Sequence, residues 1–187
     1  MNRVVQKAAT TLLAAGFLVG TVSSVSPAMA AVKKVPAPRP VIHESLVILT
    51  GGMLKRPGWP MVYPERLILP KGYTIDLTIR NFDDGTAPLA KGTYQYDKVT
   101  GTIGNFELVN GRRVTSLNPG AVSHTITIGQ LGINIPIPIK STVEVKFHVN
   151  KKGTFYWQCM APCGSGSSGW GGPMSTNGWM KGSIVVQ

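Results

Sequence analysis

Acidic residues and cysteine and histidine donors are scarce in this sequence. Its 187 residues include 8 Asp and Glu, and no carboxylate pair or Ser/His/Asp pattern accompanies the other reactive side chains, so an enzyme is the least favoured class. Two cysteines and three histidines do not readily supply the four Cys/His ligands of a zinc site. Beyond residue 30, no apolar run reaches the roughly 18 residues that a membrane span needs. Helical periodicity is also nearly absent there, which disfavours a helical domain.

The first thirty residues have the three parts of a secretory signal. Arg3 and Lys7 accompany an apolar stretch over 8–25, and the segment ends in the small-residue pattern Ala28-Met29-Ala30. We expect residues 1–30 to be a signal peptide cleaved after the last of these, which makes the protein exported and periplasmic or extracytoplasmic. The alternative is a retained N-terminal anchor, which would make the protein membrane-associated rather than soluble.

Positive charge dominates the remaining sequence. Without residues 1–30 the chain keeps 17 Lys and Arg and 8 Asp and Glu, a net charge of +9. This balance favours anionic partners, among them an anionic membrane surface. Nucleic acid is not expected, because export separates the protein from it and the basic residues are not interleaved with stacking aromatics. Residues 31–40, with prolines near their end, predict an extended spacer before the folded domain.

Residues 41–187 predict a single all-β domain. Runs rich in Val, Ile, Thr and aromatic residues alternate with Gly, Pro and Asn, and we expect strands at 41–49, 65–70, 74–81, 122–128, 141–149, 153–159 and 182–187. Period-two alternation is clean at Val143, Val145 and Phe147, which places His148 on the solvent side. The pattern as a whole is typical of a β-sandwich.

Two segments depart from this rhythm. Residues 83–118 form an insertion, whose Asn110-Gly111 pair predicts an added hairpin. The Gly/Ser-rich residues 164–179 lie between two predicted strands, so we expect a long, shaped surface loop rather than a flexible linker.

Imidazole, thiol and thioether groups follow one another along the C-terminal half. His124 lies in a predicted strand, Cys159 and Cys163 follow a later strand, and Met174 and Met180 precede the last one. This set suits copper, since thiolate and thioether favour Cu(I) and a His/Cys set with a weak Met carries electrons. For an exported protein the competing interpretation is a Cys159–Cys163 disulfide. A loop so short gains little from a bridge, and a bridge leaves the other donors unexplained.

The stretch VSHTITIGQLGINIPIPIKSTVEVKFHVNKKGTFYWQCMAPCG, residues 122–164, resembles the periplasmic copper domain of cytochrome c oxidase subunit II. The shared features are a strand His followed by Ser or Thr, and the motif G-T-[FY]-Y-x-x-C-x3-C-G. Near the C-terminus, WMKGSIVV resembles the family's M-x-G-x-[IV]-V-V, and upstream VYPERLILPKGYTIDLTIRN resembles its strand, turn and strand. The resemblance implies a cupredoxin-like Greek-key β-sandwich over residues 41–187.

The resemblance also implies a ligand set. It makes His124 the first imidazole ligand, Cys159 and Cys163 the bridging thiolates, Ala161 a backbone carbonyl ligand and Met180 the thioether ligand. Copper is the implied cofactor.

The sequence departs from the family in three ways. The family's second ligand His falls on Asn177 here, the loop before the Met is longer, and the transmembrane hairpin typical of subunit II is missing. A binuclear centre would therefore need Met174, Asn177 or a loop carbonyl in place of the lost imidazole. Asn is a poor ligand for Cu(I), which counts against it.

A mononuclear copper site is the simpler expectation. His124, Cys159 and Met180 would hold one copper ion in cupredoxin style. Either Cys163 or His43 would supply the remaining ligand. The binuclear centre is the alternative.

Functions of different classes follow from these sites. The first is an exported copper electron carrier in or near a respiratory chain, similar to subunit II, with a redox partner such as a cytochrome c or a terminal oxidase. We expect an electron carrier or accessory oxidase subunit rather than a stand-alone enzyme. The alternatives are a periplasmic copper-handling or delivery protein and a metal-free module with a Cys159–Cys163 disulfide.

Overall fold

A computed structural model describes residues 37–187, and this part of the chain is built from strands and four short 3-10 turns. The strands are β1 (Val41–Leu49), β2 (Met61–Tyr63), β3 (Arg66–Leu69), β4 (Thr74–Asn81), β5 (Glu107–Val109), β6 (Arg112–Val114), β7 (Val122–Ile128), β8 (Ile133–Pro138), β9 (Thr142–His148), β10 (Gly153–Gln158) and β11 (Lys181–Val186). The 3-10 turns are η1 (Tyr94–Asp97), η2 (Pro119–Ala121), η3 (Gly129–Leu131) and η4 (Gly172–Met174). Within 37–187, no helix is long and apolar enough to span a membrane.

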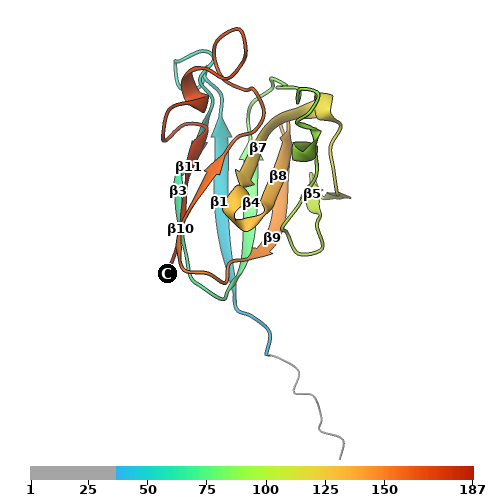
Figure 1. Cartoon of the computed structure of the whole chain (residues 1–187), viewed down its shortest axis with the longest axis vertical. Helices are drawn as coiled ribbons and strands as arrows, with labels where there is room; N and C mark the ends of the chain where they lie inside the picture. Colours follow the sequence, from blue (N-terminus) through green and yellow to red (C-terminus); the bar gives the residue numbers. More distant parts are fainter. Residues whose placement is uncertain (1–36) are drawn as a thin grey trace, which may run out of the picture. The chain divides into compact units, whose positions relative to one another are not determined.

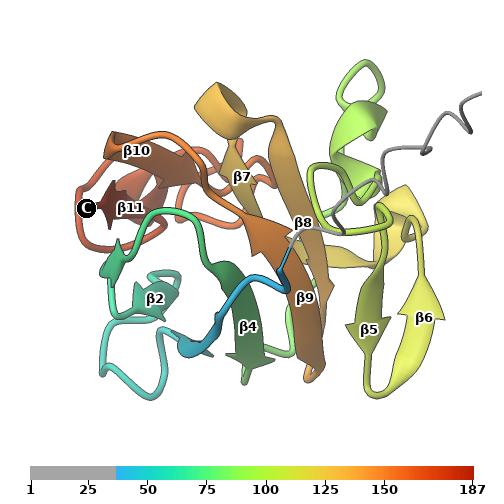
Figure 2. The ribbon, with the colours of Figure 1, turned by 90° about the horizontal axis from the view of Figure 1, so that it is seen from below.

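The strands form two sheets that face each other as layers (Figure 1; Figure 2). One sheet has the order β2-β1-β4-β9-β5-β6 and the other β3-β11-β10-β7-β8. The pairs β1/β4 and β3/β11 are parallel, and the remaining neighbours are antiparallel. Because the chain crosses between the layers, strands distant in sequence become neighbours, as in a Greek key. The predicted all-β Greek-key sandwich is confirmed.

The core lies between the two sheets and comes from residues 46–186. In β9, Val143, Val145 and Phe147 point inward and are buried, while Lys146 and His148 are exposed, as the alternation predicted. The sandwich therefore has its whole core inside the described segment, which also forms one compact unit. The signal peptide predicted at 1–30 and most of the predicted spacer 31–40 lie outside the described residues.

The strand β8 was not predicted, because prolines interrupt its apolar run. Pro136 and Pro138 cannot donate hydrogen bonds to a ladder, so they argue against a strand inside a sheet. In the structure β8 is the outermost strand of its sheet, paired along its length with β7 and bridged on its other side to Thr100 through Asn134 alone. At that edge a missing donor costs little.

The insertion 83–118 contains the predicted hairpin. β5 and β6 pair antiparallel around Asn110 and Gly111, which have φ of 49° and 78°. The turn residues are those that adopt positive φ readily. The hairpin extends the first sheet beyond β9, through the pairing of β5 with β9.

Candidate metal site

The site forms where β7 and β10 separate. The two strands pair through Gln158 and Thr127 alone, so the chain leaves the ladder just before Cys159. The N–H of Thr125 is thereby free to point at Cys159, and it lies 3.4 Å from Sγ. His124 precedes it on β7 and is fully buried.

Three side chains meet at this place. The ligand atoms of His124, Cys159 and Cys163 all lie within 4.8 Å of one another. The two Sγ atoms are 3.3 Å apart, beyond the 2.03–2.05 Å of a disulfide, and both cysteines are free. The sequence placed these residues in one site, and the fold brings them together.

The imidazole of His124 is held in one orientation. Its Nε2 donates to Oδ2 of Asp83 at 3.0 Å, on the segment that follows β4. Its Nδ1 is buried and has no hydrogen-bond partner among the described residues. A buried ring nitrogen without a partner, opposite one that donates to a carboxylate, is the arrangement of a metal-ligating histidine.

Burial and nearby groups shift the pKa values of His124 and Asp83. Burial lowers the pKa of His124, but its hydrogen bond to Asp83 and the nearby Cys159 sulfur outweigh this and raise that pKa to about 9. Burial raises the pKa of Asp83, but hydrogen bonds from His124 and from the Gly85 N–H hold it below its ordinary value. The metal-free site therefore favours an imidazolium beside a carboxylate.

The two thiols are shifted in opposite directions. Burial raises the pKa of Cys159, yet the hydrogen bond from Cys163 and the nearby His124 imidazole bring it well below its ordinary value. The pKa of Cys163 is well above its ordinary value, because this thiol donates to Cys159 and is buried. One thiolate is thus prepared in the metal-free site, and a bound metal would displace the remaining protons.

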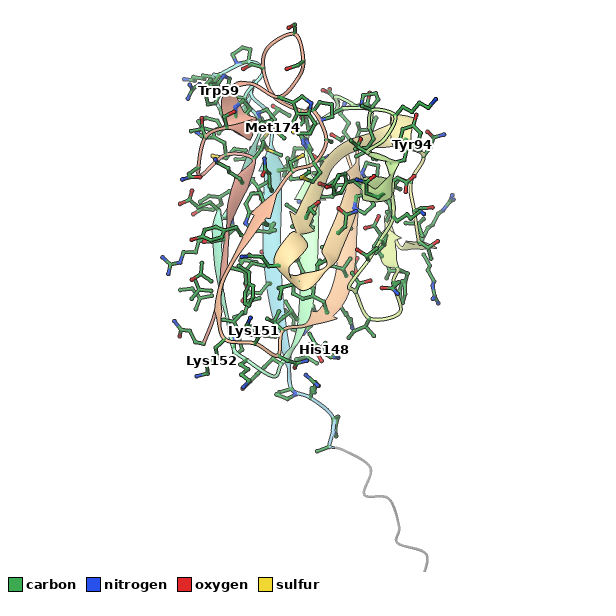
Figure 3. The ribbon with its side chains drawn as sticks, in the orientation of Figure 1. Trp59, Tyr94, His148, Lys151, Lys152 and Met174 are labelled. Carbon is green, nitrogen blue, oxygen red and sulfur yellow. The ribbon has the colours of Figure 1, made fainter. Side chains whose placement is uncertain are left out.

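Met174 is the thioether that the structure places beside the thiols. Its Sδ lies 3.3 Å from Sγ of Cys163, at the end of η4 (Figure 3). Met180, which the sequence favoured, is fully buried, and its main-chain carbonyl accepts from the Cys159 N–H at 2.9 Å. Met174, which the sequence favoured less, is therefore the methionine whose sulfur lies 3.3 Å from a thiol sulfur.

Ala161 lies between the two cysteines and turns its carbonyl toward them. Its oxygen accepts from the Cys163 N–H at 2.8 Å and lies 3.5 Å from Sγ of Cys159. The backbone curl that this bond closes brings the two thiols to the same side.

Two other proposed ligands lie elsewhere. His43 is exposed on β1, with its Nδ1 3.4 Å from Oδ2 of Asp76, and it is outside the donor group. Asn177 is exposed, in a groove that Tyr156 and Gly182 also line. The alternation that makes His43 solvent-facing on β1 is the reason it cannot complete a buried site as folded.

The long loop 164–179 is shaped by close backbone contacts. A Cβ on Gly164 would meet the carbonyl of Gly171 and would lie 2.8 Å from Cγ of Met174. Beside the loop, the rings of Trp59 and Trp179 pack edge to face at 5.0 Å, and the Arg56 guanidinium stacks on Trp59 at 3.3 Å. The expected shaped loop is present, and it is what positions Met174.

A hydrogen-bonded chain joins the site to the insertion. The Met160 N–H donates to Oγ1 of Thr125 at 2.8 Å, the hydroxyls of Thr125 and Thr127 are 2.9 Å apart, and Thr127 donates to Oδ1 of Asn134 at 2.6 Å. Asn134 in turn donates to the carbonyls of Tyr96 and Lys98. Every polar group of this chain has a partner, so it fixes the loop between the thiols.

The sequence reasoning missed Asp83, Thr127 and Asn134. Asp83 stands in the Asp83-Asp84-Gly85 turn, whose composition signals a turn and nothing more. Thr127 and Asn134 belong to strands whose pairing across the sheet edge was not predicted.

Comparisons with known proteins give structural likeness alone. No family model matches the sequence, and no curated protein does. The metal-binding domain of the Cu(I)-exporting P-type ATPase CopA from Streptococcus pneumoniae D39 aligns over 81% of this chain and 91% of its own, with 12% identity and a TM-score of 0.42. Rusticyanin from Thiobacillus ferrooxidans aligns over 80% and 79%, with 16% identity and a TM-score of 0.37. A multicopper oxidase from Campylobacter jejuni aligns over 83% of this chain and 31% of its own, with 11% identity and a TM-score of 0.41.

Proposed function

We propose that this chain is an exported, cupredoxin-like copper protein that carries electrons in or near a respiratory chain. The observation that supports it most is the buried Nδ1 of His124, without a hydrogen-bond partner in the described chain and beside two thiols 3.3 Å apart. A ring nitrogen left unpaired in a buried site is costly unless a ligand satisfies it.

The donor set fits copper. Two thiols, an imidazole and the Met174 thioether are soft donors, and a His/Cys set with a weak thioether belongs to electron-transfer copper sites. Bound copper would supply a one-electron couple there. The resemblance of residues 122–164 to subunit II supports the same metal, whereas its second imidazole has no counterpart at Asn177. We therefore favour one copper ion over two.

The chain's own residues would keep the site nearly unchanged between the two oxidation states. His124 is oriented by Asp83, and Cys159 is approached by the Thr125 N–H. The buried positions of His124 and Cys159 exclude water from the donors. A site held this way by two rigid strands needs little rearrangement on electron transfer.

The partner and the location follow from the sequence. The predicted signal over 1–30 supports export, and the likeness to subunit II supports a redox partner such as a cytochrome c or a terminal oxidase. The net charge of +9 favours a partner with an acidic docking face.

Copper handling is the second candidate. The thiols and Met174 bind Cu(I) preferentially, and this chain offers one imidazole to the site, which weakens its hold on Cu(II). A protein of this kind would bind Cu(I) and pass it on without redox cycling.

Copper loading with optical and paramagnetic resonance spectroscopy tests these functions. An intense thiolate-to-Cu(II) band with a one-copper hyperfine pattern supports the mononuclear carrier, and a pattern shared over two copper ions supports the binuclear one. Tight Cu(I) binding without a stable coloured Cu(II) form supports handling. Absence of copper binding, with Cys159 and Cys163 oxidised to a disulfide, overturns both.

Two variants make the experiment specific. Cys159→Ser removes the thiolate nearest His124 and is expected to abolish the band. His43→Asn changes an exposed histidine outside the donor group and is expected to leave the spectrum unchanged.

A further inference from the structure

One end of the sandwich collects basic side chains from three separate segments. They come from the residues before β1, from the turn between β3 and β4, and from the turn between β9 and β10. The exposed members are Arg39, Lys71, His148, Lys151 and Lys152. We call this group the basic end; Figure 3 labels three of its members, His148, Lys151 and Lys152.

Main-chain and side-chain bonds hold these segments together. The Gly72 N–H donates to the carbonyl of Val149 at 3.1 Å, which joins the two turns. The Arg39 guanidinium donates to Oδ1 of Asn150, which joins the segment before β1 to them. The basic groups are therefore presented on a fixed surface.

No acidic side chain lies in these segments. Residues 37–40, 70–73 and 148–153 contain neither Asp nor Glu. Asp76 is the third residue of β4, and its carboxylate already lies 3.2 Å from Lys146 and 3.4 Å from His43. The surface is strongly cationic on balance.

The basic end and the donor group lie at opposite ends of β10. Lys152 precedes the strand and Cys159 follows it, so they are seven positions apart, or about 23 Å of extended chain. Met174 is seen at the far end from Lys151 and Lys152 in Figure 3. A surface bound through the basic end would leave the donor group facing away from it.

The described chain also begins at the basic end. Residue 37 leads into β1 there, and the sequence just before it carries Lys33 and Lys34. Further upstream lies the apolar stretch over 8–25 that predicts a signal or an anchor. A signal peptide and an anchor both bring the chain to a membrane, which favours a membrane as the anionic partner of this end.

We infer that the basic end docks on an anionic lipid surface and turns the donor group toward the aqueous side. Lysines on separate turns act as point charges over a flat layer of headgroups, where each contributes to binding and is screened by salt. Nucleic acid is disfavoured, because the one aromatic side chain of these segments, Tyr73, is partly buried against the core and Arg39 is their one arginine. The inference does not depend on copper.

Vesicle sedimentation of the chain from Ala31 tests the docking, since the sandwich has its whole core within 37–187. The vesicles contain phosphatidylcholine alone or with a third of phosphatidylglycerol. We expect binding to the anionic vesicles alone, weakened by added salt. Lys71→Gln/Lys151→Gln/Lys152→Gln should lower the partition coefficient by about fivefold per lysine, or roughly 100-fold in all.

A matched variant separates a defined surface from diffuse charge. Lys55→Gln/Lys91→Gln/Lys98→Gln removes the same charge from exposed positions outside the basic end. It should keep vesicle binding within about threefold of the parent, and both variants should melt close to the parent because the lysines are exposed.

Three results would overturn the docking. One is failure of the parent chain to bind the anionic vesicles, and another is an equal loss in both triple variants. The third is poly-glutamate binding as tightly as the vesicles and depending on Lys71, Lys151 and Lys152, which would assign the surface to an acidic protein. Copper spectra of the proteins are recorded separately, so this failure is distinct from that of the proposed function.

Discussion

The Asp83 carboxylate and the His124 imidazole, 41 residues apart in sequence, are joined by a hydrogen bond of 3.0 Å between Oδ2 and Nε2. The bond uses the ring nitrogen that faces away from the thiols, so the other one, Nδ1, is left for a ligand. It also raises the basicity of the imidazole, as carboxylates do beside metal-bound histidines. Asp83 thus acts on the site through its hydrogen bond to His124.

Replacement of Asp83 should weaken copper binding. Asp83→Ala removes the acceptor and leaves the buried His124 Nε2–H unpaired, so we expect a 10- to 100-fold loss of affinity. Asp83→Asn can still accept the hydrogen bond and should lose less. Competition with a Cu(I) chelator measures both, with Asp84→Asn as the exposed neighbouring control. Unchanged affinity in Asp83→Ala would show that His124 needs no second partner.

Met174 should matter more to the copper spectrum than Met180. The Met174 Sδ is 3.3 Å from Sγ of Cys163, whereas Met180 accepts a hydrogen bond from the Cys159 N–H through its main-chain carbonyl. Met174→Leu is therefore expected to shift the thiolate-to-copper band and the reduction potential. Met180→Leu should chiefly lower stability, by about 1 kcal/mol for a volume-conserving change in a core. The reverse result would make Met180 the ligand, as the resemblance implied.

Gly164 should be intolerant of a methyl group. A Cβ there collides with the Gly171 carbonyl and with Met174, so Gly164→Ala must displace the loop and its thioether. We expect about 1–3 kcal/mol of lost stability together with an altered copper band. Gly129→Ala, where a Cβ meets nothing within 4 Å, is the matched control. Both are measured by thermal melting and by the optical spectrum of the loaded protein.

The hydroxyl of Thr127 should hold the thiol loop in place. Thr127→Val keeps the volume but leaves the Thr125 hydroxyl proton and Oδ1 of Asn134 without a partner, which costs about 1–3 kcal/mol and loosens Met160. Thr127→Ser keeps the bond and should restore both the urea midpoint and the copper spectrum. If the Val and Ser variants have the same copper spectrum, the hydrogen bonds from Thr125 to Asn134 stabilise the fold but do not position the site.

Much of the fold could be predicted because each strand carries its own signal. The alternation in β9 and the Asn110-Gly111 turn depend on neighbouring residues, and both are found as predicted. β8 could not be predicted, since Pro136 and Pro138 are tolerated through its place at the sheet edge. Edge position is a property of the whole sheet.

Some residues of the site could also be predicted from the sequence, and others could not. Cys159 and Cys163 are close in sequence, and His124 is tied to them by a motif, so the three could be grouped beforehand. The choice of Met174 over Met180 depends on how the glycines of the loop 164–179 close on one another, which spacing does not reveal. Asp83 was beyond reach, because its pairing with His124 follows from the crossing between the two sheets.

Glu107 should make stability fall as pH rises. It is fully buried on β5, neither carboxylate oxygen has a partner in the described chain, and burial raises its pKa from 4.5 to about 8. A carboxyl whose folded pKa is raised contributes its stability below pH 4.5, and this contribution is lost as the pH rises toward about 8. Glu107→Gln stays neutral, so its stability relative to the parent should increase by roughly 3 kcal/mol between pH 5 and pH 8. Urea unfolding of both metal-free proteins measures this difference. The pH-dependent contributions of Asp83 and His124 to stability cancel in it, because both proteins contain these residues. A difference that does not change with pH would mean that Glu107 is ionised in the folded state with a partner or water at its carboxylate.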